Sequence, residues 1–144
     1  MNKLNDFLET LAKPFSWLTD WILRLVLGIG FFLYGYGKLP LPPKKMVTWF
    51  ESEGIPAPEL VTSMVSIGEM AAGIGIILGG FLSGVLGNVI TRLSGGAVVV
   101  IMIGAFYIAH ADWFITEKLF KEVQIFLFAL GAYYAIKGNN QEKL

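Results

Sequence analysis

The residue best suited to chemistry is a carboxyl group inside an apolar segment. Glu69 is the only ionisable residue between Leu60 and Leu82. If this segment crosses a bilayer, a charge near its centre costs at least ~2.5–3.5 kcal/mol, so such a residue usually faces the protein interior and has a partner. A carboxyl group in that position can carry a proton or form an ion pair. We therefore predict that Glu69 faces the interior of a helical bundle.

Two cations on the preceding apolar segment are candidate partners for Glu69. They belong to a row that shares one helix face, with the relative spacing 0, 4, 7, 11 and 14: Arg24, Gly28, Phe31, Gly35 and Lys38. The small and polar character of this face predicts that it points inward. The sequence thus predicts a buried polar core that contains Arg24, Lys38 and Glu69.

Three arrangements of this core stay open. At 1.5 Å per residue, Arg24 lies ~8 Å from the depth of Glu69, and Lys38 lies at a comparable distance on the other side. Either side chain can therefore pair with Glu69, or Glu69 can be protonated and neutral, which burial favours. Arg24 also has an alternative role as an interfacial anchor paired with Asp20, four residues earlier.

A second polar group is expected at one mouth of the bundle. His110, Asp112 and Glu122 all fall near the membrane boundary that also holds Lys38. A histidine beside carboxylates is suited to proton entry or to binding a quinone headgroup. The alternative is an ordinary solvated membrane boundary.

Composition places the chain among membrane proteins. Of its 144 residues 55% are hydrophobic and 15% are charged, with a mean hydropathy of +0.64, whereas soluble domains have ~25% charged residues. The net charge is zero, so nothing indicates a surface for nucleic acid. There is no cysteine and a single histidine, which argues against a metal site. We expect no metal and no covalent cofactor.

Four apolar segments must position these residues within a single domain over 1–144. They lie at about 15–39, 60–82, 93–110 and 119–137, and a spanning helix needs ~20 residues. The uncharged part of the fourth segment, Val123 to Ile136, has only fourteen residues. We predict an all-α integral membrane protein, a four-helix bundle with both termini on one side. A slight excess of Lys and Arg on that side favours the cytoplasm.

A short segment before the first span has a separate pattern. Between Lys3 and Lys13 the apolar residues follow a helical spacing: Leu4, Phe7, Leu8 and Leu11. Pro14 follows this segment. The pattern predicts a short N-terminal amphipathic helix that lies on the membrane surface.

Three sequence segments resemble one known family. RLVLGIGFFLYGYGKL (24–39) resembles the first-helix signature of the DoxX family, an Arg, a Gly four residues later, and then Gly-x-x-Lys. GIPAPELVTSMVSIGE (54–69) is similar to the loop that leads into that family's intramembrane Glu, and GAYYAIKG (131–138) is similar to its last helix. The resemblance covers roughly 21–138, and Arg24, Lys38 and Glu69 match the family's polar positions.

The resemblance implies a four-helix protein of the bacterial inner membrane. Some DoxX proteins are linked to a thiosulfate:quinone oxidoreductase subunit, and one branch looks like a receptor-assembly chaperone. The resemblance therefore implies a subunit of a membrane-bound oxidoreductase or quinone-linked complex, with quinone or lipid as ligand. The alternative is a non-catalytic accessory or assembly subunit that stabilises a larger complex. The expected partners are membrane lipids and either other membrane subunits or further copies of the chain. Whether the chain is an enzyme stays open.

Overall fold

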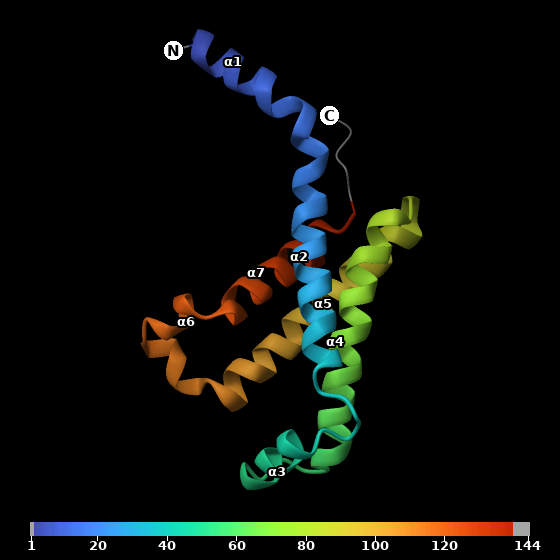
Figure 1. Ribbon diagram of the computed structural model, residues 1–144, viewed down its shortest axis with the longest axis vertical. Helices are drawn as coiled ribbons and strands as arrows, with labels where there is room; N and C mark the ends of the chain where they lie inside the picture. Colours follow the sequence, from blue (N-terminus) through green and yellow to red (C-terminus); the bar gives the residue numbers. More distant parts are fainter. Residues whose placement is uncertain (1, 140–144) are drawn as a thin grey trace.

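Helices form almost all of the described chain. The computed structural model describes residues 2–139, and this part contains no strand (Figure 1). In chain order, the elements are α1 (Asn2–Ala12), the 3-10 helix η1 (Lys13–Phe15), α2 (Ser16–Tyr36), α3 (Lys44–Ser52), α4 (Pro58–Phe81), α5 (Gly84–Ala109), the 3-10 helix η2 (Ala111–Ile115), α6 (Lys118–Lys121) and α7 (Val123–Lys137).

The bundle consists of two helix pairs joined through α4. Helix α4 packs against both α2 and α5, and α5 packs against α7. In Figure 1, α2 and α4 run side by side, whereas α5 and α7 run obliquely to them. The predicted all-helical fold is confirmed.

Three helical segments are long and apolar enough to cross a membrane. They are Lys3–Tyr36, which covers most of α1 together with η1 and α2, and the helices α4 and α5. Helix α7 is apolar but has 15 residues, or ~22 Å at 1.5 Å per residue, against a hydrocarbon core of ~30 Å. The architecture is that of a helical membrane bundle, with α7 as a shorter fourth member.

Two helix boundaries differ from the sequence prediction. The third span is predicted to begin at 93, but α5 begins at Gly84 and only Leu82 and Ser83 connect it to α4. Gly84, with φ +68°, makes the turn, and Gly87 packs against the chain just before the helix. The fourth segment is interrupted at Glu122, whose backbone is extended between α6 and α7.

The pairing of α2 with α4 depends on direct contact between their backbones. A Cβ atom added to Gly28 would lie 2.8 Å from the carbonyl oxygen of Gly73, and one added to Gly73 would lie 2.5 Å from the carbonyl oxygen of Gly28. Only glycine fits at such a distance. Small residues at a helix interface let backbones approach closely within a membrane. The inward face predicted for α2 is therefore the face that touches α4.

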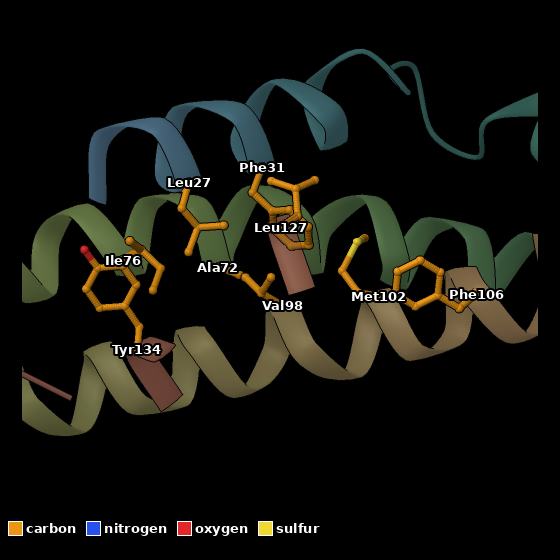
Figure 2. Packing of buried hydrophobic residues seen from close by; sticks show 9 residues of the cluster. All are labelled: Leu27, Phe31, Ala72, Ile76, Val98, Met102, Phe106, Leu127 and Tyr134. Atoms are coloured by element: carbon orange, nitrogen blue, oxygen red, sulfur yellow. The ribbon is translucent and has the colours of Figure 1, made fainter. Parts of the chain in front are cut away.

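A single apolar core joins the four longest helices of the bundle (Figure 2). Side chains from α2 and α4 meet side chains from α5 and α7 there. The buried members of this core are Leu27, Phe31, Ala72, Ile76, Val98, Met102, Phe106, Leu127 and Tyr134.

The outer surface of the bundle is also apolar. Large hydrophobic side chains with 40% or more of their surface exposed follow the helices, for example Ile22, Val26 and Ile29 on α2 and Leu93 and Val100 on α5. Continuous apolar surface of this kind indicates contact with a membrane or with partner helices. The fold thus has an apolar outside, an apolar core, and buried polar groups that need a separate explanation.

Candidate functional site

Glu69 forms an ion pair with Lys38. Glu69 lies in the middle of α4 and is only 4% exposed, and the Nζ atom of Lys38 donates a hydrogen bond to its Oε2 atom. Lys38 follows the end of α2, where its backbone N–H donates to the carbonyl oxygen of Gly35 at 3.1 Å. Of the two cations that the sequence offered, Lys38 is the one that contacts Glu69.

A close contact one turn earlier brings Lys38 to α4. A Cβ atom on Gly35 would lie 2.5 Å from the carbonyl oxygen of Ser66 and 2.9 Å from the backbone nitrogen of Met70, so the two helices touch at this level. The side chain of Lys38 then extends along α4 toward Glu69. A quarter of the Lys38 side chain stays exposed, against 5% for the Glu69 side chain. The Glu69 side chain of the ion pair is therefore buried, whereas the Lys38 side chain is partly exposed.

Two buried hydroxyl groups precede Glu69 on the same face of α4. Thr62 and Ser66 have no exposed surface. Thr62 donates to the carbonyl oxygen of Pro58 at 2.8 Å, and Ser66 donates to that of Thr62 at 2.8 Å. Both hydroxyl protons are used within the helix, so Lys38 is the side chain that supplies a hydrogen bond to Glu69.

Arg24 lies in a second polar site at the other end of the core. Its side chain is 1% exposed, and its guanidinium group lies over the ring of Tyr134, 4.7 Å from the ring centroid. It donates four hydrogen bonds: to Asp20 at 2.7 Å, to the carbonyl oxygen of Ile76 at 2.8 Å, to Thr91 at 3.2 Å and to Asn139 at 2.7 Å. A guanidinium group suits this position because its donors point in fixed and different directions.

The Arg24 site includes residues from four helices and from the segment after α7. Asp20 forms a second ion pair, with Lys137, at 3.2 Å. The Tyr134 hydroxyl donates to the backbone carbonyl of Asp20 at 2.9 Å. The side-chain amide of Asn139 donates to the carbonyl oxygens of Gly79 at 2.8 Å and Leu82 at 3.0 Å. The site therefore ties α2, α4, α5 and α7 together at one end of the bundle.

The single polar core expected from the sequence is divided in two. The apolar side chains of Leu27 and Phe31 separate Arg24 from Lys38 along α2. Helical spacing predicted both cations on one inward face, but fourteen residues separate them, or ~21 Å at the rise of a helix. Asp20, one turn from Arg24, supplies a nearer anion than Glu69 does. The alternative pairing of Arg24 with Asp20 is the observed one.

The expected polar mouth does not form as a cluster. The ring of His110 stacks on Trp113, with centroids 3.7 Å apart, and Asp112 approaches Lys118 at 4.0 Å between two exposed side chains. Glu122 is exposed at the break between α6 and α7. Within residues 2–139 no hydrogen bond or ion pair joins the three residues to one another or to Lys38. In Figure 1 the loop from η2 to α6 lies well apart from α3, because α5 leads away from α2.

Sequence reasoning missed the residues that complete the Arg24 site. Thr91 lies between the second and third predicted apolar segments, and Asn139 lies beyond the last one. The one available signal in the sequence was a polar residue directly after Gly138. In the structure Gly138 has a positive φ of +67° and follows the end of α7. Arg92 supports the same helix end, since its guanidinium donates to the carbonyl oxygens of Ala135 at 3.1 Å and Ile136 at 2.7 Å.

The described residues contain no group of three or more histidines and carboxylates placed to hold a metal ion. An open apolar groove of about 310 Å³ lies on the outer side of the α2–α4 pair, lined by Ile29, Phe32, Ile74 and Ile77. This groove suits a hydrocarbon chain by its lining, and it offers no polar group to orient a ligand.

Comparison with known proteins found one match, to a family model. The family model named DoxX matches residues 19–111, which contain Arg24, Lys38, Glu69, most of α2 and the whole of α4 and α5. No curated protein and no solved structure matches the chain. Because the family model covers more than half of the sequence, the chain belongs to the DoxX family.

Proposed function

We propose that the protein is a non-catalytic accessory subunit that stabilises a larger membrane complex. The observation that carries this proposal is the pairing of its buried ions. Glu69 has Lys38, and Arg24 has Asp20 together with three neutral acceptors. Each buried charge considered for chemistry is thus neutralised or hydrogen-bonded within the chain.

Such pairing supports a structural function over proton transfer. A carboxyl group that carries protons must exchange them with a neighbouring donor or acceptor, whereas Glu69 is held by a cation and has little exposed surface. Removing one partner of a buried ion pair is strongly destabilising, because the other charge is left uncompensated. Both sites are therefore expected to hold helices in place.

The outer surface supports a role among other membrane subunits. Helix α5 exposes an apolar face that includes Leu93, Val100 and Ile103, together with glycines that have no neighbour within 4 Å of an added Cβ atom, Gly96 and Gly104. Helices pack closely in membranes where small residues face a partner. This face is available to lipid or to a helix of another subunit.

A quinone-linked subunit is the second candidate. The apolar groove on the outer side of the α2–α4 pair is formed by α2 and α4, Glu69 also lies on α4, and Lys38, just after α2, is partly open. A hydrocarbon tail in the groove and a polar headgroup near Lys38 would use both features. The chain has no cysteine and one histidine, so the electrons in such a complex would come from a redox partner.

The substitution Glu69→Gln separates the two candidates. An accessory function predicts less assembled complex, because the pair with Lys38 is lost, while activity per assembled complex is unchanged. The measurement is native electrophoresis of detergent-extracted membranes, combined with quinol-dependent oxygen consumption normalised to the assembled complex. Glu59→Gln is the matched control, since Glu59 is exposed in the first turn of the same helix.

The opposite result would support the quinone-linked candidate. Normal assembly with loss of quinol-dependent activity would mean that Glu69 takes part in proton-coupled chemistry. Normal assembly with normal activity would contradict both functions for the Lys38–Glu69 pair.

A further inference from the structure

Helix α1 leaves the bundle with an unpartnered apolar face. Each described side chain from Lys3 to Ala12 is exposed. Four large hydrophobic residues are among them, with 53–65% of their surface exposed: Leu4, Phe7, Leu8 and Leu11. The chain changes direction at η1, which contains Pro14, so α1 points away from the axis of α2 (Figure 1).

The length of α2 places α1 at the membrane boundary. Helix α2 has 21 residues, or ~32 Å at 1.5 Å per residue, which already matches a hydrocarbon core of ~30 Å. Trp17, in the first turn of α2, is 65% exposed, and tryptophan is enriched where membranes meet water. Helix α1, which precedes α2, therefore lies where the hydrocarbon core ends.

The apolar face of α1 is in register with the lipid-facing side of α2. Leu4, Leu8, Leu11 and Phe15 are spaced by four, three and four residues, and the same spacing continues from Ile22 through Val26, Ile29 and Leu33. These α2 residues are exposed, whereas Arg24, Leu27 and Phe31 on the other side of α2 are buried against the bundle. A bend at η1 toward this row would lay the face of α1 onto the lipid.

The polar side chains of α1 and η1 together carry no net charge. Lys3 of α1 and Lys13 of η1 balance Asp6 and Glu9. The polar groups also find partners within the helix, since Asn5 donates to Glu9 at 2.8 Å and Thr10 donates to the carbonyl oxygen of Asp6 at 2.7 Å. Attraction to anionic lipids depends on basic residues, so this face does not select for lipid charge.

We propose that α1 is an in-plane anchor that binds the boundary between headgroups and acyl chains beside α2. It recognises the bilayer through apolar area, and a zwitterionic lipid surface is sufficient. The anchor would fix the depth at which α2 enters the membrane. This inference is independent of the function proposed above.

The test uses single cysteines in the full chain, which has none of its own. Spin labels are attached to Leu4→Cys and Leu8→Cys on the apolar face and to Asn5→Cys and Thr10→Cys on the polar face. The protein is reconstituted in phosphatidylcholine vesicles, and collision rates with oxygen and with a water-soluble nickel complex are measured. We expect an oxygen-to-nickel ratio several-fold higher at the two apolar positions. Added phosphatidylglycerol should leave this difference unchanged.

Three results would overturn the proposal. Equal ratios at the four positions would mean that α1 stays in water. Spectral broadening between labels on different copies would mean that α1 binds a second copy of the chain. A difference that needs phosphatidylglycerol would mean that lipid charge drives binding.

A charged variant provides a second measurement. Leu8→Glu should raise nickel access at a label on Leu4→Cys several-fold, without changing the melting temperature of the bundle. Thr10→Glu, on the polar face, should change neither. A lower melting temperature for Leu8→Glu would show that α1 packs on the bundle, which contradicts the anchor.

Discussion

The environment of the Glu69 carboxylate determines what a change at Lys38 does. Lys38 supplies the cation next to a carboxylate that is almost fully buried. Breaking a fully buried ion pair costs ~3–5 kcal/mol, and the cost here is smaller because part of Lys38 reaches solvent. Because Glu69 is the more deeply buried partner, loss of Lys38 leaves a buried negative charge without a cation.

We predict that Lys38→Met lowers the melting temperature in detergent, because it leaves Glu69 buried without a cation. The double variant Lys38→Met with Glu69→Gln should recover part of the loss, since the glutamine carries no charge. Lys44→Met, at an exposed position at the start of α3, is the control. Strictly additive effects of the two changes would contradict the pairing.

Residue types and spacing were enough to find these ions but not to pair them. The helical period predicts Arg24 and Lys38 on one side of a helix; in the structure Arg24 is buried on α2, and Lys38 follows the end of α2. The period carries no information on which cation reaches the depth of Glu69, because tilt and side-chain length decide that. In the structure Arg24 pairs with Asp20, which lies one turn away on the same helix, and not with Glu69.

At the scale of the helices, the glycine contact between α2 and α4 positions the Lys38–Glu69 site. We predict that Gly73→Ala destabilises the protein, since the added Cβ atom would lie 2.5 Å from the carbonyl oxygen of Gly28. Forcing extra atoms into a packed interface costs ~1–3 kcal/mol. The measurement is thermal unfolding in detergent.

Gly30→Ala is the matched control for this prediction. It changes another glycine of the same helix pair, and its added Cβ atom would have no neighbour within 4 Å. This variant should keep or slightly raise the melting temperature, because alanine favours a helix more than glycine does. Equal effects of the two substitutions would contradict a backbone contact at Gly73.

Long apolar segments made α2 and α4 predictable from the sequence. The start of α5 and the start of α7 were predicted at the wrong residues. Gly84 and Gly87 fall between the second and third predicted segments, yet both belong to α5, where Gly84 turns the chain and Gly87 packs closely. The charged residues before Val123 were included in the fourth span, but the helix breaks at Glu122. Glycine has both uses, and only the packed structure distinguishes them.

At the scale of the whole molecule, Asn139 closes the end of the bundle. Its side chain joins Arg24 of α2 to the end of α4, and its backbone N–H donates to Asn88 of α5 at 2.9 Å. No periodic pattern marks this residue, because it lies outside the apolar segments. Its importance follows only from the packing of the four helices.

We predict that Asn139→Ala destabilises the packing of α7 and the end of α4 against α2. Each buried polar group left without a partner costs ~1–3 kcal/mol, and three groups lose the Asn139 side chain as a partner. The expected results are a lower melting temperature and faster hydrogen exchange near Leu82. Asn5→Ala, on the exposed surface of α1, should change neither, and exchange rates equal to those of the unmodified protein would contradict the closure.

The distance in sequence between Arg24 and Asn139 has a consequence for biosynthesis. The two residues are 115 positions apart, so the ribosome completes Arg24 and the rest of α2 long before Asn139 exists. Ile76 and Thr91 are also made later. During that interval Asp20 is the partner that enters the membrane with Arg24, one turn away on the same helix. The newly made α2 therefore carries its own counter-ion to the translocon, and the later helices replace water around a pair that is already neutral.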